Sequence, residues 1–142
     1  MADSCALFQR IRERHGHYCA MSTLGGRLGL AALAALGEDG GSLTATYGID
    51  TCAADGIAVA TGCLPEQGRL TVHDRGRHRL ELRGRGGGVA AELTAAALAR
   101  AALCRQRLAA GEDAAEVLAG VRNAPDAELL VLTPLPAGES HA

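Results

Sequence analysis

The sequence contains no lysine and no tryptophan, and aromatic residues make up only 2% of its 142 positions. All 14 basic residues are therefore arginines. Schiff-base, Walker-type and pyridoxal-phosphate chemistry each require a lysine, so the composition excludes all three. A general nucleic-acid binder is expected to be basic and to offer aromatic stacking surfaces. This chain has a net charge of −2, one Phe and two Tyr, and we expect no nucleic-acid partner.

Long apolar runs are also missing. The nearest candidate, residues 28–36, is shorter than the roughly 20 residues that a membrane-spanning helix needs. The N-terminus has no basic segment followed by an apolar one, the pattern of a secretory signal. The sequence therefore predicts no membrane association and a cytoplasmic location, where thiols stay reduced. The odd number of cysteines, five, agrees because it does not suit a full disulfide framework.

Small apolar side chains dominate what is present. Hydrophobic residues make up 48% of the chain, and there are 19 glycines. A core of such small side chains buries little area per residue, so we expect a dimer or a bound metal to add stability. The length fits one domain, 1–142, with a core at about 4–133 and a frayed tail at 134–142.

Periodicity and turn signals predict an α+β fold, in which a small antiparallel sheet is flanked by helices. Helices are expected at residues 4–14, 24–36, 52–61, 89–110 and 112–121. Strands are expected at residues 43–49, 70–73, 78–83 and 129–132. The turn Asp74–Arg77 is expected to join the second and third strands as a hairpin. Gly25, Gly26 and Gly29 weaken the second helix, which favours a close approach by another backbone or a ligand there.

Two histidines and a cysteine alternate in one short stretch. His15, His17 and Cys19 can lie on one face if the segment is extended. Imidazole and thiolate are preferred ligands of zinc and of similar divalent metals. The alternative is a pair of surface histidines beside a buried thiol.

A second cluster lies at residues 50–55, at the start of the third expected helix. If Asp50 or Thr51 caps that helix, Cys52 lies in its first turn, where the helix dipole lowers a thiol pKa. Asp55 follows one turn later and can hydrogen-bond a metal-binding histidine. Alternatively, Asp50 only caps the helix and Asp55 is a solvated carboxylate.

Cys63 is the least certain candidate ligand. It follows Cys52 by eleven residues, so an intact helix would hold the two thiols roughly 16 Å apart. Both reach one metal only if the helix is shorter; otherwise Cys63 is structural or belongs to a dimer-related site. Cys5 and Cys104 lie in helical contexts and are expected to be structural.

The motifs occur together and in order: His15-Gly16-His17-Tyr18-Cys19, then Asp50–Ile57, Thr61-Gly62-Cys63 and Asp74–Arg77. In this combination the sequence resembles the FmdE family, which is named after formylmethanofuran dehydrogenase, over about residues 8–92. The resemblance implies an α+β core, a dimer, and a His/Cys cleft that is a candidate metal or active site.

The sequence departs from the family pattern at several points. Cys-Pro-Gly becomes Cys19-Ala20-Met21, and a glutamate is replaced by Gly48. The family's Gly-Lys-Gly-Asn stretch is replaced by Glu66-Gln67-Gly68-Arg69, which removes the cationic lysine of the family pattern. The 142 residues do not include the C-terminal zinc finger of some members, and we therefore expect no role in a dehydrogenase complex.

We therefore expect a cytoplasmic FmdE-like metalloprotein, an enzyme that acts on a small molecule through a metal or reactive-thiolate site, and a homodimer. Zinc is the expected ion and iron the alternative. The expected metal ligands are His15, His17, Cys19, Cys52 and Cys63. The expected catalytic residues are Cys52, His17 and Asp55. The alternative functions are a non-catalytic carrier of metal, cluster or sulfur, and a purely structural protein that retains the motifs.

Overall fold

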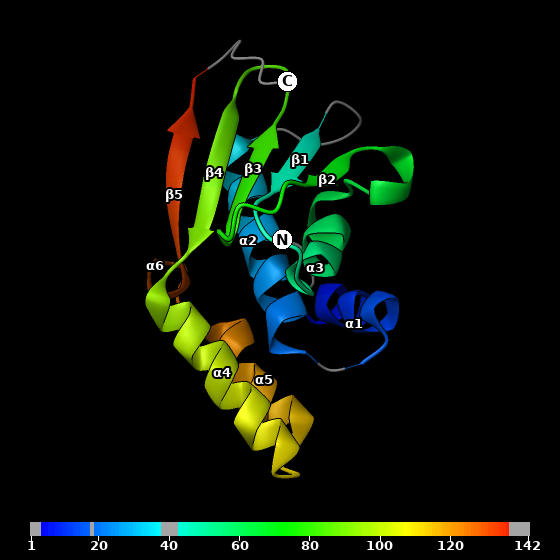
Figure 1. The fold of residues 1–142 in the computed structure, drawn as a ribbon, viewed down its shortest axis with the longest axis vertical. Helices are drawn as coiled ribbons and strands as arrows, with labels where there is room; N and C mark the ends of the chain where they lie inside the picture. The colour runs from blue at the N-terminus through cyan, green and yellow to red at the C-terminus, as the bar shows by residue number, and fades with distance from the viewer. Residues whose placement is uncertain (1–3, 18, 38–42, 137–142) are drawn as a thin grey trace.

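The computed structural model describes residues 4–17, 19–37 and 43–136. The helices are α1 (Ser4–His15), α2 (Ala20–Leu36), α3 (Ala53–Thr61), α4 (Ala95–Ala109), α5 (Ala114–Asn123) and α6 (Asp126–Leu129), with a 3-10 turn at Pro65–Gln67. The strands are β1 (Thr44–Tyr47), β2 (Leu70–Val72), β3 (Arg79–Arg83), β4 (Gly88–Leu93) and β5 (Leu130–Leu135). The chain forms a single α+β domain, as predicted (Figure 1).

The five strands form one mixed sheet in the order β2-β1-β3-β4-β5. β1 and β2 are parallel, and the other pairs are antiparallel. The expected hairpin between residues 70–73 and 78–83 is therefore wrong, because β1 lies between these two strands. Their connection instead crosses the end of β1, where the Gly48 carbonyl accepts from the N–H groups of Arg75 and Arg77 at 2.8 and 3.1 Å. The turn residues indicated a reversal, but could not indicate that a third strand fills the gap.

The helix expected over residues 89–110 begins only at α4, because the start of that stretch belongs to β4. Ala90 and Ala91 favour helix locally, yet both are buried in the sheet, since β4 pairs with a strand on each edge. Thr94 separates the two elements. Its hydroxyl accepts from the N–H of Ala97 at 3.1 Å and so caps α4.

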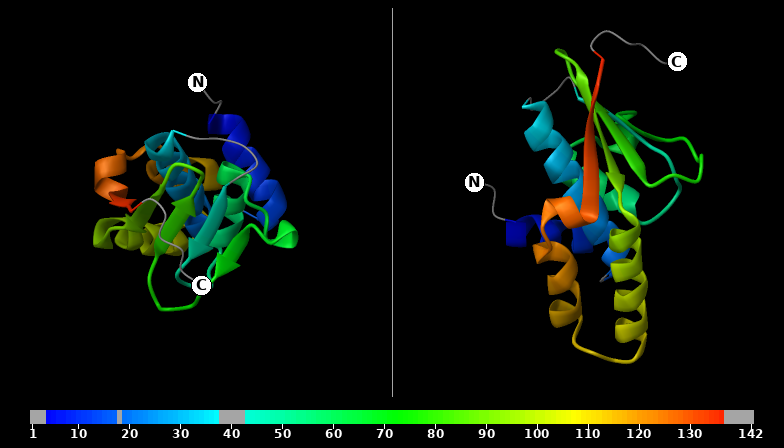
Figure 2. Two further views of the ribbon diagram at one scale, coloured as in Figure 1. Left: turned by 90° about the horizontal axis from the view of Figure 1, so that it is seen from above. Right: turned by 90° about the vertical axis from the view of Figure 1, so that its left-hand side faces the viewer.

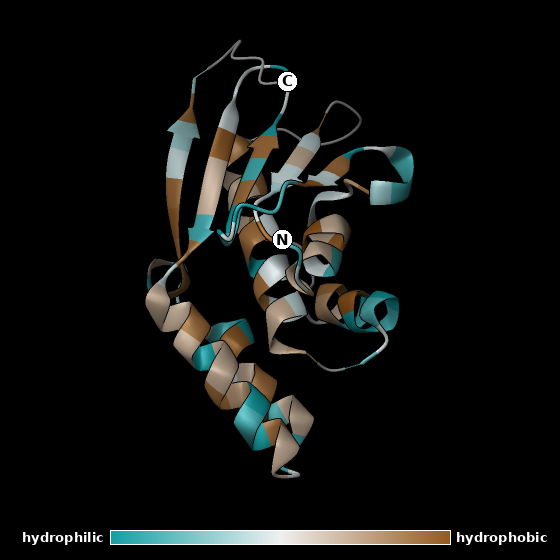
Figure 3. Ribbon diagram, in the orientation of Figure 1, coloured by the Kyte–Doolittle hydropathy of each residue, from teal (hydrophilic) through white to brown (hydrophobic). Residues whose placement is uncertain are grey.

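One face of the sheet packs on α2, and the other is polar. Along β3, Leu80 and Leu82 are fully buried in the same core cluster as Leu24 and Leu28 of α2. Arg79, Glu81 and Arg83 alternate with them, and Glu81 pairs with both arginines at 3.3 and 3.0 Å. Figure 2 shows α2 along one side of the sheet, and Figure 3 shows the alternation of apolar and polar positions along β3.

Helices α2 and α3 approach each other through glycines. A Cβ on Gly25 would lie 2.0 Å from the Ala53 carbonyl oxygen, and a Cβ on Gly56 would lie 2.0 Å from the Ser22 carbonyl oxygen. Neither backbone can give way without moving a whole helix. The predicted close approach to the glycine-rich helix is therefore confirmed, and it fixes the start of α3 beside the start of α2.

The α4–α5 pair extends below the sheet (Figure 1) and is tied to α2 by one arginine. Arg27 is only 9% exposed. Its guanidinium donates to the carbonyls of Val121, Arg122 and Ala124 at 2.9, 2.8 and 2.5 Å, and to Asp126 at 2.7 Å. A cation thus satisfies the carbonyls at the C-terminal end of α5, where the helix dipole is negative.

The C-terminal strand is longer than expected. β5 continues to Leu135, so the tail expected to fray from residue 134 begins with two residues of strand. Residues 137–142 and the turn expected at 38–42 lie outside the described residues. Among the described residues, no helix combines the length and the apolar character that a membrane crossing requires.

Candidate metal centre

The turn between α1 and α2 brings two imidazoles and a thiol together. His15 ends α1, Gly16 has a left-handed φ of +94°, and Cys19 is the N-cap residue of α2. The ring centroids of His15 and His17 are 4.4 Å apart. One ligand atom from each of His15, His17 and Cys19 lies within 4.8 Å of the others. The segment is not extended as we expected, because His15 is helical, yet the reversal at Gly16 groups the three side chains.

These separations are close to those of a filled metal site. Zinc bonds nitrogen at about 2.1 Å and sulfur at about 2.3 Å, so two ligands of one tetrahedral ion lie about 3.5 Å apart. An approach of about an ångström per side chain therefore closes the group around an ion. The donor set, two imidazoles and one thiolate, suits zinc and also iron.

His15 is oriented for this task by Asp55. Its Nδ1 lies 2.8 Å from the Asp55 carboxylate, and its Nε2 is buried without a hydrogen-bond partner in the described part of the chain. A carboxylate on one ring nitrogen selects the tautomer in which the other offers a lone pair. The predicted hydrogen bond between Asp55 and a nearby histidine is confirmed.

Asp55 is itself held in place by an arginine. Arg14 donates from Nε to Asp55 at 3.2 Å and from Nη2 to Glu66 at 2.9 Å. The Arg14 guanidinium lowers the pKa of Glu66. This chain of contacts joins α1, α3 and the 3-10 turn around His15.

Cys52 lies next to Cys19, but not in the state that we predicted. It is the N-cap residue of α3, and the Thr51 hydroxyl accepts from the N–H of Ala53 at 3.3 Å. The pKa of Cys52 is raised, first by burial and then by Cys19 and the Asp55 carboxylate. The expected lowering by the helix dipole is therefore wrong, because burial disfavours the thiolate and the neighbouring Cys19 and Asp55 oppose a further negative charge.

Cys63 lies in the hydrophobic core, away from the His/Cys group. Its side chain is fully buried, and its N–H donates to the Thr61 hydroxyl at 3.2 Å. Among the described residues, the group able to share one ion comprises His15, His17 and Cys19. Helix α3 is intact between Cys52 and Cys63, so a structural role and a dimer-related site stay as the alternatives for Cys63.

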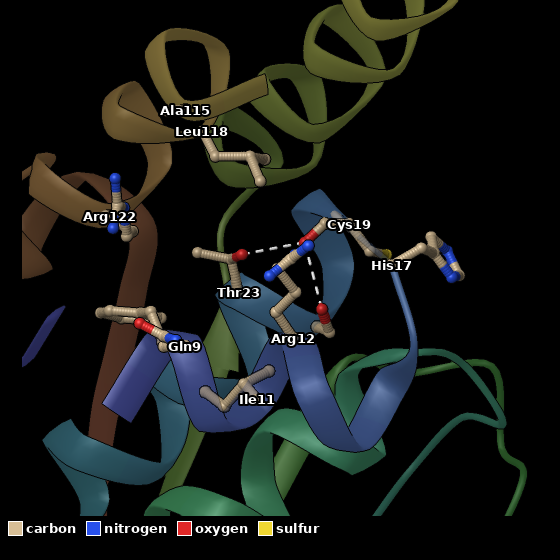
Figure 4. A pocket seen from close by; sticks show the side chains of 11 residues that line it. Gln9, Ile11, Arg12, His17, Cys19, Thr23, Ala115, Leu118 and Arg122 are labelled. Atoms are coloured by element: carbon tan, nitrogen blue, oxygen red, sulfur yellow. Dashed lines mark hydrogen bonds between the residues drawn. The ribbon is translucent and has the colours of Figure 1, made fainter. Parts of the chain in front are cut away.

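A pocket of about 410 Å³ opens beside this group. Cys19 and His17 lie at one end, Arg12 projects into the middle and Arg122 lies across from them on α5 (Figure 4). Neither arginine could be assigned to a site from the sequence. Arg12 is visible there only as one more helical arginine, and the placement of α5 over the start of α2 has no local signal.

Comparisons with known proteins identify a family, a solved structure of similar fold and a curated relative. Residues 14–131 match the family described as "FmdE, Molybdenum formylmethanofuran dehydrogenase operon". The chain is similar to the crystal structure of an FmdE-like protein from Syntrophus aciditrophicus, whose description refers to a tungsten formylmethanofuran dehydrogenase. The TM-score is 0.66 at 22% identity, over 89% of this chain and 68% of that one.

A curated protein from Archaeoglobus fulgidus named "Probable S-adenosyl-L-methionine-binding protein" is 35% identical over 83 residues. The match covers 54% of this chain and 23% of that protein. The chain thus spans less than a quarter of that relative.

Proposed function

The chain belongs to the FmdE family, and on that premise we propose that it is a metal-dependent enzyme acting on a small molecule. His15, His17 and Cys19 hold one divalent ion, with zinc favoured and iron as the alternative. When bound, the ion supplies a Lewis acid that polarises a carbonyl or activates a thiol or water. The chain's own residues bind, orient and screen that ion.

One observation carries the proposal: the buried Nε2 of His15 has no hydrogen-bond partner among the residues that the structure describes. A buried polar atom left without a hydrogen bond costs about 1–3 kcal/mol, and such an atom calls for an explanation. Asp55 fixes the opposite nitrogen, so the Nε2 lone pair is directed toward a ligand. His17 and Cys19 offer the further donor atoms within reach.

Three protein ligands favour an enzyme over a structural site, which closes all four positions. Cys52, beside Cys19, is the candidate for the fourth position when no substrate occupies it. The adjoining pocket of about 410 Å³ supports substrate access. If the Cys52→Ser variant keeps its metal but loses turnover, the enzyme hypothesis is supported. If the purified protein only transfers its metal to an acceptor protein and shows no turnover, the carrier hypothesis is supported instead.

Replacing Asp55 with asparagine is expected to weaken zinc binding by about 10–100-fold, because the amide no longer fixes the His15 tautomer. The measurement is competition with a chromophoric chelator at constant pH. Glu112→Gln makes the same change in an exposed pair with Arg107 and is expected to leave the zinc affinity unchanged.

Cys63→Ala provides the thiol control for the same experiment. It is expected to keep one zinc per chain, because Cys63 is buried in the core. Loss of zinc in Cys63→Ala, with normal affinity in Asp55→Asn, would place the ion elsewhere and contradict the assignment.

A further inference from the structure

The pocket beside the candidate metal centre is lined by positively charged side chains without acidic ones among the described residues. Guanidinium groups enter its lining from two helices, Arg12 from α1 and Arg122 from α5. A planar guanidinium matches a carboxylate or a phosphate with paired hydrogen bonds, so two of them in one pocket favour an anion.

The N-terminus of α2 adds to this field. Cys19, the N-cap residue, lines the pocket, makes no side-chain hydrogen bond to the helix and precedes a first turn without acidic residues. The hydroxyls of Ser22 and Thr23 donate back to the Cys19 carbonyl at 3.1 and 2.8 Å, so they do not occupy the N–H groups of the first turn. These N–H groups and the dipole of a 17-residue helix favour negative charge nearby.

The rest of the lining is mixed: Gln9, Ser22 and Thr23 are polar, and four side chains are apolar. Phe8 and Ile11 contribute from α1, and Ala115 and Leu118 contribute from α5. A free inorganic anion would leave this surface in contact with water. An anionic group carried on a short apolar body would cover it and gain the corresponding burial energy.

We propose that this pocket binds an organic anion, a carboxylate or phosphate monoester on a short apolar body. Arg12 and Arg122 take the anionic group, and the apolar side chains of α1 and α5 take the body. The end that reaches Cys19 and His17 is the reacting end, a part of the proposal that rests on the metal centre proposed above. The substrate class of this protein is therefore a small amphiphilic anion.

The test compares four probes with the same six-carbon chain: hexanoate, hexyl phosphate, hexanol and hexylamine. Inorganic phosphate, which has the charge but no apolar chain, shows how much the apolar chain contributes to binding. Binding to the zinc-loaded full chain is measured by calorimetry at low and high salt. We expect hexanoate or hexyl phosphate to bind at least about tenfold more tightly than hexanol, and high salt to weaken that binding. Equal affinity for hexanol, preference for hexylamine, or no binding at millimolar concentration would overturn the proposal.

Variants identify the pocket. Arg122→Gln is expected to lose about tenfold in anion affinity and to leave hexanol binding unchanged, whereas Arg122→Lys recovers part of the loss. Arg10→Gln changes an exposed arginine of α1 outside the lining and is expected to bind like the parent. Anion binding unchanged in Arg122→Gln would overturn the assignment.

Zinc content is measured on each sample. A chain that binds no zinc but prefers hexanoate to hexanol refutes the metal centre and supports the anion site. A chain that binds one zinc and does not distinguish the probes refutes the anion site alone. The two proposals therefore fail separately.

Discussion

Arg27→Ala is expected to lower the free energy of unfolding by about 3–5 kcal/mol. The substitution removes the guanidinium donors from the carbonyls of Val121, Arg122 and Ala124. Val121 and Ala124 are buried, so water cannot replace the guanidinium without opening the contact between α2 and α5. The bond to Asp126 contributes less, because that carboxylate is 60% exposed.

Urea unfolding followed by circular dichroism measures the loss. Arg105→Ala, at an exposed position on α4, serves as the matched arginine control and is expected to change stability by no more than about 0.5 kcal/mol. Because α5 carries Leu118 and Arg122 of the pocket, Arg27→Ala should also weaken hexanoate binding while zinc is retained. A loss of stability similar to that of Arg105→Ala would refute the structural role of Arg27.

Gly56→Ala is expected to destabilise the fold by about 3 kcal/mol or more. The added Cβ would lie 2.0 Å from the Ser22 carbonyl oxygen and 2.5 Å from the Gly26 nitrogen. Both atoms belong to the backbone of α2, so α2 and α3 must move apart. Since α3 carries Asp55, this movement also separates Asp55 from His15 and is expected to lower zinc affinity.

Gly120→Ala is a control substitution that is expected to change the stability in the opposite direction. Gly120 lies inside α5, where an added Cβ would have Arg100 Nη1 at 4.0 Å as its nearest neighbour. Alanine there is expected to stabilise the protein by about 0.5–1 kcal/mol, because it favours the helix. Thermal unfolding of the two variants tests the contrast. Equal midpoints would mean that α2 and α3 do not cross as closely as the structure has them.

The candidate site could be predicted where its residues are neighbours in sequence. His15, His17 and Cys19 lie within five consecutive positions, so a tight turn there can bring their side chains together. Asp55 could be predicted as a histidine partner, because it lies in the first turn of α3 and its carboxylate points toward the start of the helix. The pKa of Cys52 could not be predicted, since it depends on a thiol and a carboxylate that only the folded chain places nearby.

The fold could be predicted to a similar depth. Element types were correct where caps and turns are local, as at α1, α3 and α5. The predicted element type was wrong at β4. Ala90 and Ala91 favour a helix by local propensity, but pairing with β3 and β5 holds them in a strand. The insertion of β1 between β2 and β3 depends on long-range pairing, which turn residues do not encode. The homodimer stays a prediction.

X-ray absorption at the zinc edge of the loaded wild-type protein tests the proposed metal centre most directly. We expect one ion per chain, with nitrogen ligands at about 2.0–2.1 Å and sulfur at about 2.3 Å. His15 and His17 supply the nitrogen, and Cys19 supplies the sulfur, with Cys52 as a second sulfur when no substrate is present. A zinc shell of oxygen alone, or a purified chain that retains no metal after loading, would contradict the proposed centre.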